Sequence, residues 1–159
     1  MAMGLPLGPV LAKIFLGYCE FLILENRWPE LCQRFVDDTF SLFAGGRGQA
    51  LCFLELLNSL HLSLTFTMEN DFDNRLPFLD VLVLRKDERF SITVYQKPMA
   101  TGLYTRRDSY CAPGQKIGLI RSLALHGKRI CSAEYLDDKI TQLLSIFEKN
   151  DYRSTLVNT

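Results

Sequence analysis

The stretch that decides the fold is Arg34-Phe35-Val36-Asp37-Asp38-Thr39-Phe40-Ser41-Leu42-Phe43. Two adjacent carboxylates, Asp37 and Asp38, stand between two short apolar runs. Because the flanking residues include β-branched and aromatic side chains in alternation, they predict two short strands with the acidic pair at or near the turn. Ionised carboxylates are costly to bury without a partner. The pair therefore requires a basic residue, water at an exposed turn, or a divalent metal ion.

Length and composition predict a globular chain. Its 159 residues are enough for a domain with a hydrophobic core, and 48% hydrophobic with 23% charged residues is typical of ordered proteins. Lys and Arg together equal Asp and Glu at 18 each, so no overall positive charge indicates nucleic acid. Between residues 96 and 129, however, the only acidic residue is Asp108. The basic residues of this segment are Lys97, Arg106, Arg107, Lys116, Arg121, Lys128 and Arg129.

Cysteine spacing and the N-terminal residues predict the compartment. The five cysteines are widely spaced and form no Cys-x-x-Cys pair, which indicates free thiols rather than a zinc site or a disulfide framework. Residues 1–10 lack the basic leader of a secretory signal. The apolar run 10–24 is interrupted by Lys13 and Glu20 and is too short to span a bilayer. We expect an intracellular protein, nuclear or cytoplasmic, that is neither secreted nor embedded in a membrane.

Hydrophobic periodicity predicts an α+β fold in which the strands precede a C-terminal helical pair. Ser132 is a plausible N-cap for the last helix. The expected elements are a helix over 8–25, the hairpin, a helix over 49–60, strands over 61–69, 76–84 and 90–96, an irregular stretch over 98–115, and helices over 116–125 and 133–147.

Two motifs taken together resemble a reverse transcriptase. Phe35-Val36-Asp37-Asp38 is similar to the aromatic-x-Asp-Asp box of that family, which forms the metal-binding turn of the polymerase palm. Met3-Gly4-Leu5-Pro6-Leu7-Gly8-Pro9-Val10-Leu11-Ala12 resembles the preceding box, a Gly/Pro loop that runs into a helix. The spacing of about one long helix between the boxes is also similar. The resemblance implies a partial polymerase palm made of helix, β-hairpin, helix and further antiparallel strands.

Later segments are similar to the polymerases of Penelope-like retroelements, and the resemblance extends through about Tyr152. Each segment alone is compatible with an ordinary core strand or helix stripe, so their order and spacing carry the resemblance. The segments are Leu57-Asn58-Ser59-Leu60-His61, Leu64-Thr65-Phe66-Thr67-Met68-Glu69, Leu76-Pro77-Phe78-Leu79-Asp80-Val81, Val94-Tyr95-Gln96-Lys97-Pro98, Ile130-Cys131-Ser132 and Ile146-Phe147-Glu148-Lys149-Asn150.

The resemblance implies two-metal nucleotidyl transfer onto a primer 3′-hydroxyl, with Mg²⁺ or Mn²⁺ as cofactor. Asp37 would be the main catalytic metal ligand and Asp38 a supporting one. The implied partners are an RNA template, a DNA primer and dNTPs. The residues expected to shape the nucleotide and template pocket are Met3, Gly4, Pro6 and Phe35.

The resemblance also implies a surface for the primer and for the nucleic-acid backbone. Residues 76–81 resemble the region of the family's primer grip, and Tyr95 and Tyr104 are interleaved with basic residues. A solvated basic loop remains an equal alternative for those cations. The residues expected to contact the primer or the phosphate backbone are Leu76, Pro77, Phe78, Leu79, Lys97, Arg106 and Arg107.

The implied organisation is a partial palm over 1–98, a basic linker over 99–115, a helical region over 116–152 with a possible helix-turn-helix-like unit, and a tail over 153–159. A further metal-binding Asp and the fingers would lie upstream, so we expect a polymerase fragment that is inactive alone. The alternatives are a non-catalytic nucleic-acid-binding module or the remnant of a decayed retroelement. A partial palm would expose an apolar face along 10–24 and the hairpin, which predicts self-association.

Overall fold

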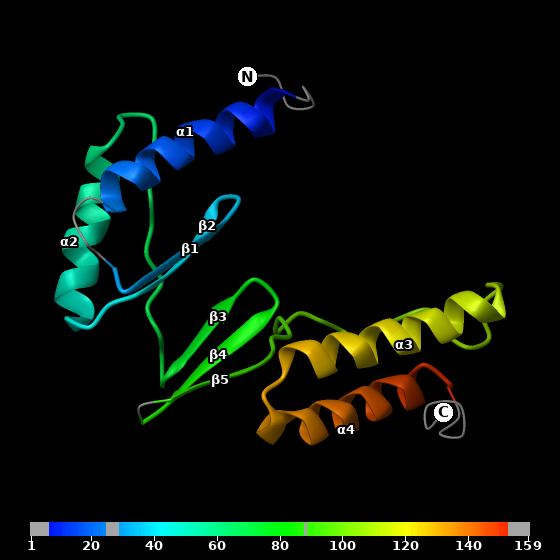
Figure 1. The fold of residues 1–159 in the computed structure, drawn as a ribbon. Helices are drawn as coiled ribbons and strands as arrows, with labels where there is room; N and C mark the ends of the chain where they lie inside the picture. Colours follow the sequence, from blue (N-terminus) through cyan, green and yellow to red (C-terminus); the bar gives the residue numbers. More distant parts are fainter. Residues whose placement is uncertain (1–6, 25–28, 88, 153–159) are drawn as a thin grey trace. The chain divides into compact units, whose positions relative to one another are not determined.

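The computed structural model describes residues 7–24, 29–87 and 89–152, and Figure 1 shows their fold. The expected α+β class is confirmed, since the described residues form four helices and two small antiparallel sheets. The chain divides into an N-terminal unit, Met1–Glu69, and a C-terminal unit, Asn70–Thr159. All five cysteines are free, and no described helix combines the length and apolar character that crossing a membrane requires.

The N-terminal unit contains α1 (Leu7–Leu24), β1 (Leu31–Phe35), β2 (Asp38–Leu42) and α2 (Gly46–Ser59). Both helices were expected from their apolar periodicity, although α2 begins three residues earlier than predicted, at Gly46. The strands pair antiparallel from Leu31 opposite Leu42 to Phe35 opposite Asp38. Phe53 is buried and contacts Phe43 edge to face, with ring centroids 5.3 Å apart. This contact packs α2 against the residue that follows β2.

Much of the described apolar stripe of α1 is exposed, although Phe15 contacts His61 edge to face. Cys19 is buried, but Ile14, Tyr18 and Phe21 are each about 60% exposed or more. The hairpin also carries exposed apolar residues, with Phe35 at 59% and Val36 at 66% exposure. The exposed apolar face expected for a partial palm is therefore present, and self-association through it stays a prediction.

Residues 61–69 are not a strand, which corrects the expectation drawn from their alternation. Leu64, Phe66 and Met68 are half-buried and alternate with exposed residues, whereas Leu62, expected on the same face, is fully exposed. The backbone is instead held by Asn58, whose side-chain oxygen accepts a hydrogen bond from the Phe66 amide at 2.7 Å and whose amide donates to the Phe66 carbonyl at 3.2 Å. Alternation reports which face is buried, whereas a strand also needs a backbone partner.

The sheet of the C-terminal unit has the order β3 (Arg75–Phe78), β4 (Val81–Lys86) and β5 (Arg89–Val94), all antiparallel. Strands β4 and β5 form a hairpin. The single strand expected over 76–84 is wrong, because a two-residue turn at Leu79 and Asp80 folds it into β3 and β4. Leu79 has φ of 55° in the left-handed region, where Gly or Asn is usual. An apolar run without a turn residue conceals such a reversal.

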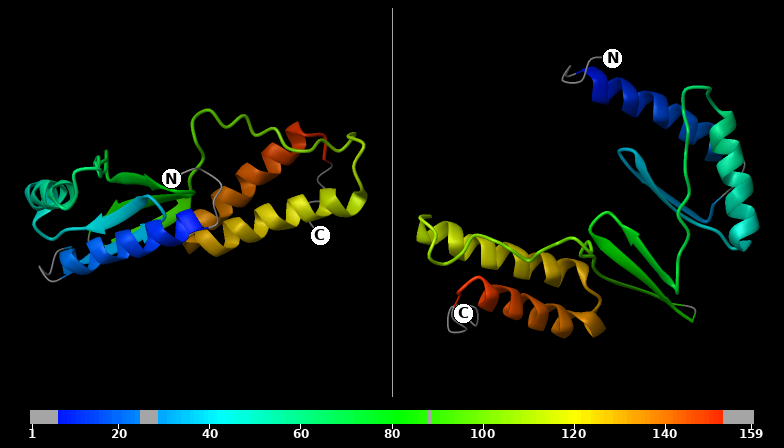
Figure 2. Two further views of the ribbon diagram at one scale, coloured as in Figure 1. Left: turned by 90° about the horizontal axis from the view of Figure 1, so that it is seen from above. Right: turned by 180° about the vertical axis from the view of Figure 1, so that it is seen from behind.

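The helical pair consists of α3 (Pro113–Ile130) and α4 (Ala133–Lys149), which lie side by side and run in opposite directions (Figures 1 and 2). Pro113 stands at the start of α3, where its missing N–H costs nothing. The predicted end of this helix at 125 is wrong, because α3 continues to Ile130. A Cβ on buried Gly127 would lie 3.3 Å from Cγ of Lys139, so glycine permits the close approach of the two helices.

Residues Cys131 and Ser132 join the helices, and Ser132 fixes this link to the sheet. Ser132 is the residue before α4, as predicted, but its hydroxyl makes no capping hydrogen bond. The hydroxyl instead accepts from the Ile92 amide at 2.9 Å, while the Ser132 amide donates to the Ile92 carbonyl at 2.8 Å. The link therefore pairs with the free edge of β5, which anchors the start of α4.

Candidate functional site

The β1–β2 hairpin presents its two carboxylates at a two-residue turn. Phe35 pairs with Asp38, so Val36 and Asp37 form the loop and Asp38 begins β2. Asp37 and Asp38 are both exposed. Within the described residues neither carboxylate has a hydrogen-bond or ion-pair partner. Of the three ways to satisfy the pair, the structure excludes a basic partner among those residues and leaves water or a cation.

Arg34 connects this turn to α1. Its guanidinium makes an ion pair and a hydrogen bond with Glu20, and it also donates to the Val36 carbonyl at 3.0 Å. The hydrogen bond that Arg34 donates to the Glu20 carboxylate raises the pKa of Arg34 above its ordinary value. No local pattern indicates the pair, because 14 residues separate its members.

Val36 adopts φ of 58°, which is unfavourable for a β-branched residue. We expect Val36→Gly to have a larger free energy of unfolding than Val36→Ala by about 1 kcal/mol, because glycine adopts this conformation without strain. Glu55, exposed on α2, is the control, since Glu55→Gly should be less stable than Glu55→Ala by about 1 kcal/mol. Urea denaturation measures both differences. The same sign at the two sites would contradict a strained turn.

The turn fits a divalent metal ion in the type of its ligands but not in their number. Carboxylate oxygens suit Mg²⁺, which binds through one or two carboxylates together with water and phosphates. No third His, Cys, Asp or Glu joins them to form a metal-binding group in the described part of the chain. Phe35 lies beside the turn and is exposed. Met3, Gly4 and Pro6, expected to shape the nucleotide pocket, lie outside the described residues.

The residues expected to contact the primer or backbone fall into separate places in the C-terminal unit. Leu76, Pro77 and Phe78 form β3, and Leu79 lies in the following turn. Lys97 is exposed in the segment 95–112, here called the strap, which runs from β5 to α3. Arg106 and Arg107 lie further along the strap. Leu76–Leu79 therefore lie on one hairpin, whereas Arg106 and Arg107 lie in the strap.

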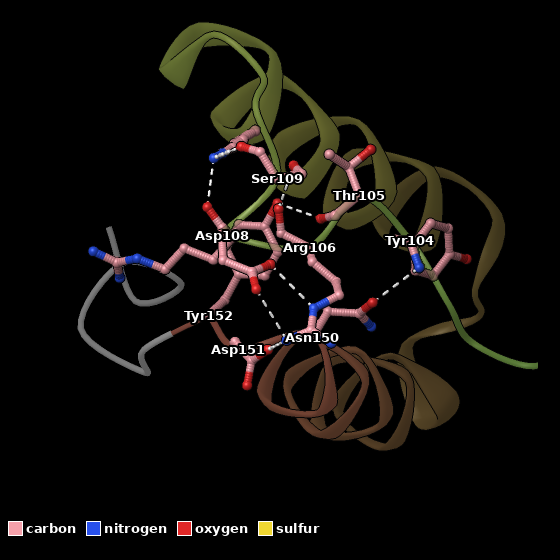
Figure 3. Close-up of polar contacts among 10 residues, drawn as sticks. Tyr104, Thr105, Arg106, Asp108, Ser109, Asn150, Asp151 and Tyr152 are labelled. Atoms are coloured by element: carbon pink, nitrogen blue, oxygen red, sulfur yellow. Dashed lines mark hydrogen bonds and ion pairs between the residues drawn. The ribbon is translucent and has the colours of Figure 1, made fainter.

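Asn150 holds the strap against the end of α4, as Figure 3 shows. It is 0% exposed. Its side-chain oxygen accepts from the Tyr104 amide at 3.0 Å, and its side-chain amide donates to the carbonyls of Gly102 at 2.9 Å and Ile146 at 2.8 Å. Its own carbonyl accepts from the Arg107 amide at 3.1 Å. The side chain thus satisfies three backbone groups, which explains how an amide is buried completely.

Acidic partners neutralise Arg106. It forms ion pairs with Asp108 at 3.1 Å and with Asp151 at 2.5 Å (Figure 3). The hydrogen bond to Asp108 raises the pKa of Arg106 above its ordinary value. Arg107 is half-buried, with one buried guanidinium nitrogen that has no hydrogen-bond partner in the described part of the chain. Arg106 is therefore engaged within the fold, and its prediction as a phosphate contact loses support.

Helix α3 carries exposed positive charge. This helix contains no Asp or Glu. Lys116 donates to the carbonyls of Arg107 and Ser109, so its ammonium is occupied. Arg121, Lys128 and Arg129 are exposed and have no ion pair among the described residues. Arg121 and Lys128 are seven residues apart, which places them on one face of the helix about 10 Å apart. In the sequence these three residues are distinguished only as members of the basic segment 96–129.

A pocket of about 560 Å³ lies between the strap, the end of β5 and the two helices. We call it the Lys139 pocket. Its lining residues are Asp80, Val94, Tyr95, Gln96, Lys97, Met99, Ala100, Thr101, Gly102, Leu103, Tyr104, Leu123, His126, Lys139, Leu143 and Ile146. His126 Nε2 lies 2.7 Å from the Asp80 carboxylate. Sequence reasoning missed this site, because its residues come from five separate elements.

Lys139 is the buried charge of the pocket. It is 9% exposed, and its ammonium donates to Gln142 Oε1 at 2.9 Å without a carboxylate partner among the described residues. Burial lowers the pKa of Lys139, and the Cys131 thiol partly opposes this shift. Lys139 is four residues before the buried Leu143, so it lies on the buried face of α4. This spacing is the sequence signal that could have indicated its burial.

We expect Lys139→Met to raise the free energy of unfolding by about 1 kcal/mol at pH 7, because methionine fills the same space without a buried charge. A lysine whose folded pKa is lowered binds fewer protons when folded, so wild-type stability rises with pH up to the ordinary lysine pKa. The difference between variant and wild type should therefore shrink from pH 7 toward pH 10. Urea denaturation at both pH values measures it. Lys149→Met, at an exposed lysine of the same helix, should change neither. A destabilised Lys139→Met would contradict the expectation.

Comparison with known proteins bears on the C-terminal unit alone. The family model of the animal helix-turn-helix domain matches residues 103–159. This part of the chain is similar to that family. The match begins within the strap and contains α3, the two-residue link and α4. The antiparallel, side-by-side packing of the two helices differs from the crossing of about 90–120° in DNA-binding helix-turn-helix motifs. No curated protein and no solved structure matches the chain.

Proposed function

We propose that the chain is part of an RNA-directed DNA polymerase of the Penelope-like type, in which the hairpin contributes the carboxylates of Asp37 and Asp38 to the metal site. The observation that carries the proposal is the tight turn with two exposed carboxylates and no basic partner among the described residues. When bound, the metal ions stabilise the attacking and leaving oxygens of nucleotidyl transfer. The ion pair from Glu20 to Arg34 positions the turn.

Manganese binding tests the metal-ligand role. We expect Mn²⁺ to broaden the backbone amide signals of Asp37 and Asp38 with a dissociation constant on the order of millimolar, because two carboxylates form an incomplete site. Asp37→Asn should abolish the broadening. The adjacent exposed pair Asp137 and Asp138 on α4 is the matched control and should respond only at higher Mn²⁺ concentration. Equal broadening at both pairs, or broadening that persists in Asp37→Asn, would contradict the proposal.

Primer extension tests activity. Two carboxylates of one hairpin cannot fill the coordination of two metal ions, so we expect the chain alone to incorporate no nucleotide on an RNA template with Mg²⁺ or Mn²⁺. Incorporation that is lost in Asp37→Ala would show that the chain is active without further residues. That result would overturn the expected inactivity while supporting the polymerase assignment.

A second candidate function is nucleic-acid binding without catalysis, through the C-terminal unit. The observation that favours it is the unpaired positive charge of α3 within the segment similar to the animal helix-turn-helix domain. Fluorescence anisotropy with a labelled RNA–DNA hybrid separates the two functions. Binding that persists in Asp37→Asn and fails in an Arg121→Gln/Lys128→Gln variant supports the module. Binding that depends on Asp37 and Mg²⁺ supports the polymerase site alone.

A further inference from the structure

The Lys139 pocket combines a buried cation with aromatic walls, and the proposed functions use neither. Lys139 is more than nine-tenths buried, yet Gln142 is the one acceptor for its three N–H groups among the described residues. A buried ammonium with donors to spare is stable when an anion or water completes its hydrogen bonds. Lys97 adds a second positive charge to the lining and is exposed. Asp80, the one carboxylate among the described residues of the lining, lies 2.7 Å from His126 Nε2, and the two ammonium groups favour a ligand that carries negative charge.

Aromatic side chains give the pocket flat apolar surface. Tyr95 and Tyr104 both line it. The Tyr104 backbone is held by the buried Asn150 amide at 3.0 Å, and the Tyr95 amide donates to the Asp80 carbonyl at 2.7 Å. These bonds fix the backbone at both residues before a ligand arrives. Aromatic side chains are the usual surfaces on which nucleic-acid bases stack.

Gln96 lines the pocket and is hydrogen-bonded to Gln142, which does not itself line it. Gln142 connects Lys139 to the strap, because its side-chain amide donates to Gln96 Oε1 at 2.8 Å. Amides of this kind supply the mixed donors and acceptors that a base edge requires. A volume of about 560 Å³ falls within the range of about 300–1,000 Å³ that is usual for small-molecule sites. The space is thus sufficient for a ligand with one aromatic ring system and one phosphate.

We propose that the Lys139 pocket binds a single unpaired nucleotide, with its phosphate on Lys139 and Lys97 and its base between the tyrosine-lined walls. This inference deepens the proposed nucleic-acid function and rests on it only for the source of the nucleotide. The nucleotide is either free or the unpaired end of a bound strand, since both present the same base and phosphate. The two lysines of the lining favour a phosphate ligand, and the two tyrosines favour an attached base.

The test is a titration of the full chain with AMP, followed by backbone amide signals in NMR spectra. We expect shifts at Thr101, Gly102 and Tyr104, with adenosine and inorganic phosphate each binding at least ten-fold more weakly than AMP. Lys139→Met should weaken AMP binding at least ten-fold. Lys149→Met removes an exposed lysine from the same helix and should remain within two-fold of the wild type. Because Lys139→Met removes a buried charge without leaving space, its fold is retained.

A 5′-phosphorylated hexadeoxyadenylate distinguishes the sources. Binding at least ten-fold tighter than AMP, with the same pocket shifts, identifies a strand end, and equal binding identifies a free nucleotide. Inorganic phosphate that binds as well as AMP, shifts outside the pocket, or equal effects of the two lysine variants would overturn the proposal. Arg121→Gln/Lys128→Gln should retain the AMP shifts. If this variant loses hybrid binding but keeps AMP binding, the pocket does not depend on the α3 cations. If it keeps hybrid binding but loses AMP binding, the module and the pocket also fail separately.

Discussion

Asn150→Ala is expected to lower the free energy of unfolding of the C-terminal unit by about 3 kcal/mol. The wild-type amide is fully buried and hydrogen-bonds to the Tyr104 N–H and to the carbonyls of Gly102 and Ile146. Alanine leaves all three groups without that partner. An unsatisfied buried backbone group costs about 1–3 kcal/mol, and the Gly102 and Tyr104 contacts also hold the strap in place. The strap should therefore detach from α4 in this variant.

Urea denaturation and native-state hydrogen exchange at α4 amides measure this effect. Asn58→Ala is the matched control. The Asn58 side chain likewise hydrogen-bonds to the backbone, through the Phe66 amide and carbonyl, but Asn58 is exposed. Water replaces the lost partner there, so we expect a cost of about 1 kcal/mol. Losses of similar size in the two variants would show that the buried amide is not the main anchor of the strap.

The Arg121→Gln/Lys128→Gln variant is expected to bind an RNA–DNA hybrid roughly 10–100-fold more weakly than wild type at 0.1 M salt. Each phosphate contact contributes about 0.9 to the slope of log affinity against log salt concentration on a duplex. The slope should therefore decrease in magnitude by about 2 when both cations are removed. Both residues are exposed without ion pairs among the described residues, so their charge is free to replace counterions.

Arg106→Gln is the control for this variant. Arg106 lies in the same basic segment, but Asp108 and Asp151 already neutralise it. We expect the affinity of this variant to stay within two-fold of wild type and its salt slope to stay within about 0.3 of the wild-type slope. Anisotropy titrations between 50 and 200 mM salt, on the order of physiological ionic strength, measure both values. An equal loss in Arg106→Gln would contradict the assignment of the interface to α3.

The acidic hairpin and both C-terminal helices could be predicted because their signals are local. Alternation on either side of Asp37 and Asp38 predicted the strands, and the observed pairing of Phe35 with Asp38 places the turn there. The position of Ser132 before α4 was predicted from its capping preference. The role of its hydroxyl was not, because the Ile92 amide that it binds is 40 residues away.

Two incorrect strand predictions have a common physical reason. The apolar run of residues 76–84 reports burial, but the turn at Leu79 depends on a left-handed φ that leucine rarely adopts. Residues 61–69 alternate as a strand does, yet Asn58 satisfies the Phe66 backbone in place of a neighbouring strand. Side-chain patterns indicate which face is buried, and the available hydrogen-bond partners decide whether a strand forms.

The sequence by itself determined where the carboxylates lie on a turn, that two helices end the described chain, and which segment is basic. Only the tertiary structure decided which cations are free. Arg106 and Arg121 belong to the same basic segment, but Asp151 reaches Arg106 from 45 residues away. The fold also buries Lys139 without a carboxylate partner among the described residues, and Lys139 lines the same pocket as the tyrosines of the strap. Charge is a property of a residue, whereas its neutralisation and desolvation depend on neighbours that only the fold supplies.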